Sequence, residues 1–291
     1  MRRLALVAAS TIAMACASHT TPSNPTPTSP AAPPPPPAPA PPPAASQTVR
    51  LGPSALRYVM HQVIHVDQQL PTGPQVLDYG LRVFFAVTIS GPADSMGYPT
   101  TITIDSVAPD SGTTIPMGIN LAAAKALSFR GRLLPRGDFR DPVPSDSVAA
   151  QLISPIVGSF RNFFPRLPIA GVTLGATWTD TTTDQQSTVS NITVTSVNSS
   201  RAAAWDERNG TRALRVEVTS DFKIQGKGQQ AGQPFEVNGS GARSGADYIA
   251  IDGRYLGGES RDSTNMTITL PVQSLTIPRT QASRTTVTVL P

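Results

Sequence analysis

The chain has 291 residues, of which 30 are proline and one is cysteine, with 14% charged residues and a formal net charge of +4. Thirteen of the prolines lie between Pro22 and Pro43, and no Asp, Glu, Lys or Arg occurs between Leu4 and Val49. Two unlike regions are therefore joined end to end, which argues against an ordinary cytosolic enzyme. About 240 residues remain from Arg50 onward, enough for one large all-β domain or two small ones with an apolar core.

The positive charge does not indicate a nucleic-acid partner. Arg2 and Arg3 lie in a segment that we expect to be removed, which leaves 21 basic against 19 acidic residues. The remaining arginines are scattered among aspartates, and no basic run with interleaved aromatic residues occurs. The phosphate contacts that dominate nucleic-acid affinity therefore have no source in this sequence.

The N-terminus has the pattern of an export signal. Residues 1–3 are positively charged at neutral pH, and the apolar stretch from Leu4 to Ala13 is too short to span a bilayer. The stretch ends in Ala13-Met14-Ala15-Cys16, which resembles the lipobox of bacterial lipoproteins. The resemblance implies a signal peptide at residues 1–15 and a lipidated Cys16 as the mature N-terminus. The alternative is cleavage by the ordinary signal peptidase.

A lipidated Cys16 would carry palmitate-type acyl chains, and two or more chains anchor a protein stably to a membrane. The expected location is the cell envelope. Ala17 follows the cysteine where an inner-membrane retention signal usually has Asp, so the resemblance favours the outer membrane, where one exists. The rest of the chain has no other cysteine and cannot form a disulfide.

Residues 16–47 read as a lipidated N-terminus followed by a disordered linker rich in Pro and Ala. This composition cannot bury a core and favours extended polyproline-II-like coil. At about 3.1 Å per residue, the stretch from Thr21 to Pro43 would reach about 70 Å. We interpret it as a spacer; the alternative is a PxxP ligand for a partner domain.

Residues 48–291 are expected to form one exported, β-rich domain. Apolar residues alternate with other residues from Leu81 to Ile89 and again from Leu214 to Ile224, where every intervening position from Arg215 to Gln225 is polar. Such alternation is typical of antiparallel strands with one face in water. We expect nine to eleven strands, separated by turns such as 71–74, 208–210 and 226–228. The run Gly239-Ser240-Gly241 also indicates a flexible turn. Asn209-Gly210 predicts a tight hairpin.

One segment, from Ser145 to Phe164, has helical periodicity instead. Its apolar residues recur at spacings of three and four, Ser145 or Asp146 can cap its start, and Pro155 should kink it. The economical fold is therefore mainly β, with a curved antiparallel sheet, as a half-barrel or a sandwich, packed on one amphipathic helix.

This combination of anchor, curved sheet and helix resembles the half-barrel domains of lipid-binding and carrier lipoproteins of bacteria. The resemblance is architectural and implies that the concave face could hold a hydrophobic ligand. The run Leu167-Pro168, followed by Gly171, Gly175 and Trp178, is similar to a pattern in uncharacterised secreted β-rich proteins, which implies no activity.

Metal ligation and nucleophilic catalysis find little support in the sequence. His61, His65 and Asp67 would share one strand face, but the two ends would lie about 20 Å apart, too far for one ion. No serine occupies a Gly-x-Ser-x-Gly elbow. Asp110-Ser111-Gly112-Thr113 resembles the active-site tetrapeptide of aspartic proteases, but no second copy occurs, so we interpret it as a loop turn. We expect no metal and no cofactor.

Two functional hypotheses follow. The first is a lipid-anchored, non-catalytic envelope domain that binds a hydrophobic small molecule or an envelope partner. Its ligand face would comprise apolar helix residues: Leu152, Ile156, Phe160, Phe163 and Phe164. The second is a carboxylate-dependent hydrolase that uses Asp206, Glu207 or Asp110 and needs a cleft joining acids from distant strands.

Overall fold

The computed structural model describes residues 47–113, 121–157, 160–186, 190–230 and 232–291. The predicted signal peptide, Cys16 and the linker up to residue 46 lie outside this part. The chain divides into two compact units, residues 1–43 and 44–291, and the second contains every described helix and strand with the hydrophobic core. A chain that begins at Ala44 therefore keeps all the interactions described below.

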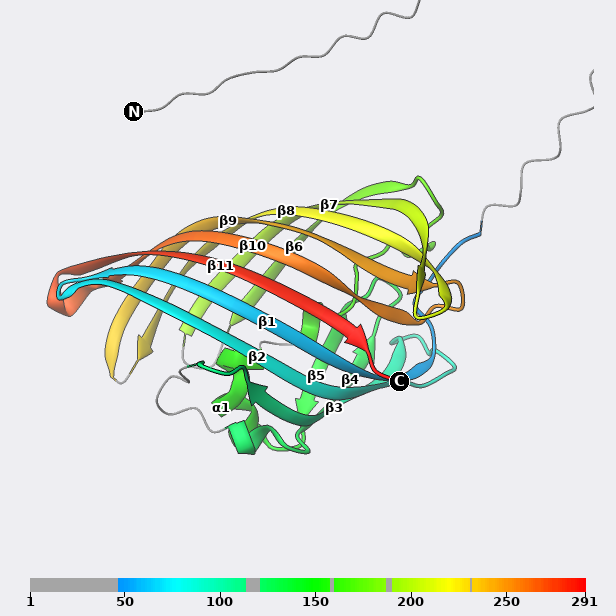
Figure 1. Ribbon diagram of the computed structural model, residues 1–291, viewed down its shortest axis with the longest axis horizontal. Helices are drawn as coiled ribbons and strands as arrows, with labels where there is room; N and C mark the ends of the chain where they lie inside the picture. Colours follow the sequence, from blue (N-terminus) through cyan, green and yellow to red (C-terminus); the bar gives the residue numbers. More distant parts are fainter. Residues whose placement is uncertain (1–46, 114–120, 158–159, 187–189, 231) are drawn as a thin grey trace, which may run out of the picture. The chain divides into compact units, whose positions relative to one another are not determined.

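Eleven strands lie in the described part of the chain, and all belong to one antiparallel sheet. In the sheet they follow the order β5-β4-β3-β2-β1-β11-β10-β9-β8-β7-β6, so β5 and β6 are the edges of an open sheet (Figure 1). Their bounds are β1 Ser54–Leu70, β2 Gly73–Ile89, β3 Tyr98–Pro109, β4 Ser128–Leu133, β5 Phe139–Pro144, β6 Thr177–Gln186, β7 Ser190–Arg208, β8 Thr211–Gln230, β9 Gln233–Ala250, β10 Tyr255–Leu270 and β11 Leu275–Val289.

The expected fold is confirmed: the protein is mainly β, and its antiparallel sheet curves over a small amount of helix. Because the 11 strands form one continuous sheet, the half-barrel arrangement describes it better than the sandwich. The alternation in β2 is borne out, since Leu81, Val83, Phe85, Val87 and Ile89 are all buried. In β8 the polar residues from Asp221 to Gln225 are exposed at alternate positions, as predicted.

The turns follow the sequence in part. Asn209 and Gly210 both have positive φ, +50° and +70°, and connect β7 to β8 as the predicted tight hairpin. The predicted turn at 226–228 is wrong, because β8 runs through it to Gln230. Gly241 also lies within a strand, β9, rather than in a turn; the ring of Phe222 lies against it, so a side chain there would collide.

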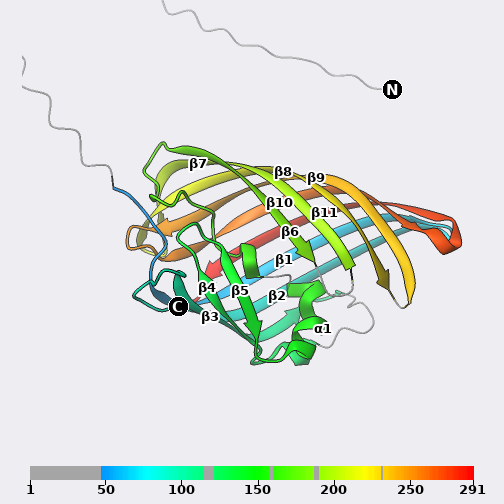
Figure 2. The same cartoon turned by 180° about the vertical axis from the view of Figure 1, so that it is seen from behind.

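The predicted helix is shorter than its periodicity suggested. Helix α1 spans Ser147–Val157, and a 3-10 turn, η2, follows at Phe160–Asn162; two more short turns, η1 and η3, span Leu121–Ala124 and Pro271–Gln273. Asp146 caps α1 as expected, because its Oδ1 accepts hydrogen bonds from the backbone N–H groups of Val148 and Ala149 at 2.9 and 3.0 Å. Figure 2 shows α1 beside the half of the sheet that contains β2 and β5.

The hydrophobic core fills one end of the concave face. Strands β1, β2, β3, β8 and β9 supply buried apolar side chains there, and Ile153 of α1 and Phe160 of η2 pack against them. Aromatic rings dominate the centre: Phe163 contacts Tyr58, Phe85 and Tyr255 edge-on, with centroids 5.2 to 5.4 Å apart. At the other end the hairpins β1–β2, β8–β9 and β10–β11 extend the sheet beyond this core (Figure 1).

Candidate functional site

A line of polar side chains crosses the concave face where the apolar core ends. Strand register places these residues directly opposite one another on six neighbouring strands, so their side chains share one face of the sheet. We call this set the polar row; it consists of Asp180 (β6), Asn198 (β7), Ser220 (β8), Arg243 (β9), Asp262 (β10) and Ser283 (β11). Inward positions of a one-sided sheet are normally apolar, so the row marks a departure from core packing.

Members of the polar row are linked in pairs. The Ser220 hydroxyl donates to Asn198 Oδ1 at 2.5 Å, and the Ser283 hydroxyl donates to Asp262 Oδ2 at 3.0 Å. The guanidinium of Arg243 donates to Ser260 Oγ at 3.2 Å, and its Nε lies 3.5 Å from Asp262 Oδ1. These last two contacts are long, and about half of the Arg243 side chain is exposed, so its guanidinium remains accessible from the concave side.

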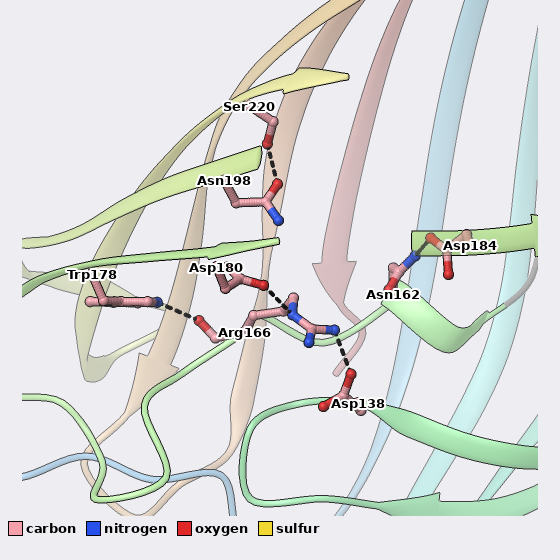
Figure 3. Close-up of polar contacts among 8 residues, drawn as sticks. All are labelled: Asp138, Asn162, Arg166, Trp178, Asp180, Asp184, Asn198 and Ser220. Atoms are coloured by element: carbon pink, nitrogen blue, oxygen red, sulfur yellow. Dashed lines mark hydrogen bonds and ion pairs between the residues drawn. The ribbon is translucent and has the colours of Figure 1, made fainter. Parts of the chain in front are cut away.

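At the β6 end of the row, Arg166 joins the segment after η2 to the sheet (Figure 3). Its guanidinium contacts Asp138 and also Asp180, whose Oδ2 lies 2.6 Å from Arg166 Nε. The side chains of Arg166, Asp138 and Asp180 are 23%, 19% and 6% exposed. Trp178 holds the same segment by donating its indole N–H to the Arg166 carbonyl at 3.1 Å. Both carboxylate oxygens of Asp180 and the Nε of Arg166 are buried, and none of these three atoms makes a hydrogen bond within the described residues, so the Arg166–Asp180 contact is an ion pair only.

A second contact to β6 lies farther along that strand and comes from η2 itself. The Asn162 side chain donates to Asp184 Oδ2 at 2.5 Å, so η2 is also attached to this edge strand (Figure 3). Asp180 and Asp184 both lie on the concave side, with Thr182 between them. Two aspartates thus lie on the concave side of the β6 edge, and the carboxylate oxygens of Asp180 are buried there.

Aromatic side chains lie between the polar row and the core. We call Phe163, Phe164 and Tyr255, which line the space beside the row, the aromatic wall. Tyr255 donates its hydroxyl to Asp247 Oδ1 at 2.7 Å, and the Tyr58 hydroxyl donates to the Tyr255 carbonyl at 2.7 Å. Burial raises the pKa of Asp247 because it disfavours the charged carboxylate, although the Tyr255 hydrogen bond opposes this effect. Burial also raises the pKa of Tyr255 and that of Tyr58, so both phenols stay protonated.

The polar row and the aromatic wall enclose a cavity of about 360 Å³ on the concave face. Phe163, Phe164 and Phe222 contribute apolar surface, and Asp180 and Arg243 contribute charge. A ligand here would contact aromatic rings together with charged and hydrogen-bonding groups; Phe163 and Phe164 lie toward the core, and Phe222 lies one inward position beyond Ser220. This is the composition of a small-molecule site, in which a few polar groups orient a mainly apolar ligand.

A larger hollow of about 1060 Å³ lies near the tips of the long hairpins. Lys223, Lys227 and Glu236 line it together with small polar side chains, and Lys227 Nζ already pairs with Glu236 Oε1 at 2.5 Å. It has no aromatic wall. We therefore place the candidate site in the smaller cavity.

The predicted ligand face contributes to this cavity in part. Phe163 and Phe164 line it, whereas Phe160 is not among its lining residues and is buried in the core. The side chains of Leu152 and Ile156 lie outside the described part of the structure. Val148, which the periodicity also assigned to the apolar stripe, is exposed.

The histidines lie on the opposite, outer face. His61 Nε2 is 2.6 Å from Asp110 Oδ2, and Arg82 Nε lies 3.2 Å from the other oxygen of Asp110. The hydrogen bond from His61 lowers the pKa of Asp110. Asp110 thus forms an outer-face ion pair rather than part of a carboxylate dyad.

His65 pairs with two carboxylates, one of which sequence analysis named. Its Nδ1 lies 2.7 Å from Asp78 Oδ1 and its Nε2 lies 3.1 Å from Asp67 Oδ2. Hydrogen bonds to Asp78 and then to Asp67 raise the pKa of His65. His61, His65 and Asp67 do not converge on one point. The described residues include no group of three or more His, Cys, Asp or Glu side chains arranged to hold a metal ion.

The carboxylates considered for hydrolysis are not the ones that meet at the cavity. Asp206 pairs with Arg215 at 3.6 Å, Glu207 is exposed, and neither lines the cavity; nor does Asp110. Sequence analysis missed Asp180, Arg243 and the other members of the polar row. One signal was present: Ser220 interrupts the apolar side of β8 between Val218 and Phe222.

The comparisons with known proteins add no assignment. No protein-family model matches the sequence, and a search of curated proteins finds no match. Within the described residues, no helix is both long enough and apolar enough to cross a membrane.

Proposed function

We propose that this chain is a lipid-anchored protein of the bacterial cell envelope whose β-rich unit binds an amphipathic small molecule on its concave face, without catalysis. The observation that carries the binding proposal is the meeting of the polar row with the aromatic wall at one cavity. A purely structural sheet would favour apolar side chains at these inward positions, because each buried polar group needs a partner.

The cavity dimensions support a small ligand. Its volume of about 360 Å³ lies at the lower end of the range for small-molecule sites, about 300–1,000 Å³. Phe163, Phe164 and Phe222 offer apolar contact, while the half-exposed Arg243 offers charge. A ligand with an apolar body and one polar end fits this division. The anchor rests on the sequence Ala13-Met14-Ala15-Cys16.

Hydrolysis is the second candidate function, and one observation favours it over binding without catalysis. Asp247, whose pKa is raised by burial, lines the same cavity as Asp262, which pairs with Arg243. General acid–base catalysis by two carboxyl groups needs them in different environments, and these two differ because Asp247 is buried whereas Asp262 faces a guanidinium.

Native mass spectrometry of residues 44–291 incubated with a total lipid extract of the producing cells tests the binding proposal. We expect a bound small molecule that Ser196→Trp displaces, because Ser196 lines the cavity and the indole would fill it. Ser199→Trp is the matched control, since Ser199 lies on the outer face of the same strand. An apo mass for the unsubstituted protein, or equal loss in both variants, would contradict the proposal. Product masses in place of an intact ligand would favour hydrolysis.

The anchor has a separate test in the full-length chain. Cys16→Ala should remove the acyl mass from the intact protein, because the sulfur that receives the lipid is gone. Intact-mass analysis of the membrane fraction measures this directly. An unchanged acyl mass in the Cys16→Ala protein would show that the lipid is attached at another residue and not at Cys16.

A further inference from the structure

The ends of the three long hairpins β1–β2, β8–β9 and β10–β11 contain no charged residue. We call these stretches the hairpin tips; they are residues 68–77, 228–235 and 263–278. All three hairpins turn at the same end of the sheet, and β1–β2 and β10–β11 are neighbours because β1 pairs with β11 (Figure 1). The uncharged stretches therefore belong to one end of the molecule.

Apolar side chains occupy exposed positions in these tips. Val272, in the turn η3 at the end of β10–β11, is 72% exposed, and Val76 of β2 is 55% exposed. Leu77 is exposed as well. A single exposed apolar residue is common on a soluble protein, whereas exposed apolar residues gathered on neighbouring uncharged segments indicate a contact surface.

Charged residues return at the border of the tips, and they are of both signs. Lys227 and Glu236 lie opposite each other on β8 and β9, Asp67 lies opposite Val76, and Arg279 follows the third tip in β11. An apolar segment bordered by charge suits the boundary between acyl chains and head groups of a bilayer. Because the border has both signs, such a contact would depend on apolar burial and not on anionic lipid.

Apolar side chains also connect the tips with the cavity. Beyond Phe222, strand register aligns Val237 of β9, Ile268 of β10 and Ile277 of β11. Each lies six residues along its strand from a member of the polar row, so all three share the concave face with that row. An amphipathic molecule that moves between a bilayer and the cavity would contact apolar surface along this path. The path favours lipid over a protein as the partner of the tips.

The predicted linker is long enough to bring the tips to the membrane. The described chain joins the sheet at the far end, where the Gly52 N–H donates to the Gly253 carbonyl, between β9 and β10, at 3.1 Å. From there β10 runs 16 residues to its tip, about 53 Å at about 3.3 Å per residue. The reach predicted for Thr21 to Pro43, about 70 Å, exceeds this distance. A chain held at Cys16 could therefore place its hairpin tips on the same membrane.

We propose that the hairpin tips insert into the surface of the bilayer to which Cys16 is anchored, so that the apolar path on the concave face opens toward lipid. This inference goes beyond the proposed function, because it assigns a second contact surface. The reach of the linker matters only if the anchor exists, and the experiment below supplies an artificial anchor, so its result is independent of lipidation and of ligand binding.

Residues 17–291 with an N-terminal histidine tag, tethered to phosphatidylcholine vesicles through nickel-chelating lipid, test the insertion. This chain has no cysteine, so Val272→Cys gives a unique site for an environment-sensitive fluorophore. We expect its emission to shift to shorter wavelength on tethering and to be quenched by spin-labelled lipid. Val148→Cys is the matched control, because Val148 is 67% exposed on α1, and its label should show neither effect.

Three results would overturn the inference: no emission shift at position 272, equal shifts at both positions, or a shift that spin-labelled lipid does not quench. The last would mean that the tips contact another copy of the chain in place of lipid. Each of these results would leave the Ser196→Trp test of the cavity unaffected.

The neighbouring hairpin tests whether the tips act together. In the labelled Val272→Cys chain, Val76→Asp should lower the quenching about twofold or more, because a carboxylate in the β1–β2 tip opposes entry into the acyl boundary. Val197→Asp is the matched control: Val197 is 53% exposed on the outer face of β7, and its substitution should leave the quenching unchanged. Circular dichroism establishes that each variant is folded. Equal loss in both folded variants, or no loss in Val76→Asp, would contradict a contact formed by neighbouring tips.

Discussion

At the scale of single residues, polar side chains at inward positions separate the cavity from the core. Ser220 occupies a position on β8 whose neighbours on the same face, Val218 and Phe222, are apolar. Asn198 Oδ1, on the neighbouring strand β7, accepts a hydrogen bond from the Ser220 hydroxyl at 2.5 Å, so this buried polar atom has a partner. The alternation in the sequence identifies Ser220 as an exception, but its partner cannot be read from sequence, because register between strands sets it.

His65 provides the residue-scale test of the outer face. Its pKa is raised by Asp78 and Asp67, so folding favours the imidazolium. The resulting stabilisation is fully present below the unfolded-state pKa near 6.5 and is lost as the pH rises through the higher folded-state pKa. Because the site is exposed, the effect on stability should be small.

We expect Asp78→Asn to lower the pKa of His65, measured from the imidazole proton shifts in an NMR titration. Asp78→Asn removes the hydrogen-bond partner that raises the His65 pKa most and leaves Asp67. Asp221→Asn, far from His65 in the sheet order, should leave the titration unchanged. A His65 pKa that does not fall in Asp78→Asn would show that the Asp78 contact is not formed in solution.

At the scale of elements, Arg166 attaches the segment after η2 to the edge strand β6. Arg166→Met should destabilise the protein by about 3–5 kcal/mol, because it leaves Asp138 and Asp180 buried without their cation. Urea unfolding followed by circular dichroism measures the change. The matched control is Arg57→Met, whose ion pair with Asp105 is exposed and should be worth less than about 1 kcal/mol. Equal losses in the two variants would mean that burial of the Arg166 cluster adds nothing.

The elements also show where sequence patterns hold and where they fail. The alternation in β2 and β8 and the Asn209-Gly210 turn are local signals, and the structure follows them. Gly241 was assigned to a turn because glycine is common there, yet it lies within β9, where the Phe222 ring of the neighbouring strand leaves no room for a side chain. That requirement arises from a contact between strands, so no pattern along one strand could predict it.

At the scale of the whole molecule, one curved sheet provides two environments on the same face. The end filled by Tyr58, Phe85 and Phe160 is a closed core, and the polar row begins where this packing ends. Sequence analysis predicted the curved sheet and placed Phe163 and Phe164 on the ligand side. It could not place Asp180 beside Arg166, because that contact depends on how the segment after η2 returns to the β6 edge.

The most direct test of the binding site is methyl NMR of residues 44–291 titrated with dodecanol, which has an apolar body and one polar end. Methyl groups distinguish the two faces of the sheet: Val194 and Val218 line the cavity, whereas Val63 and Val197 are exposed on the outer face. We predict saturable shifts at Val194 and Val218, with none at Val63 and Val197. Shifts confined to the outer-face methyl groups, or no saturable shift on the concave face, would contradict a ligand site at the polar row.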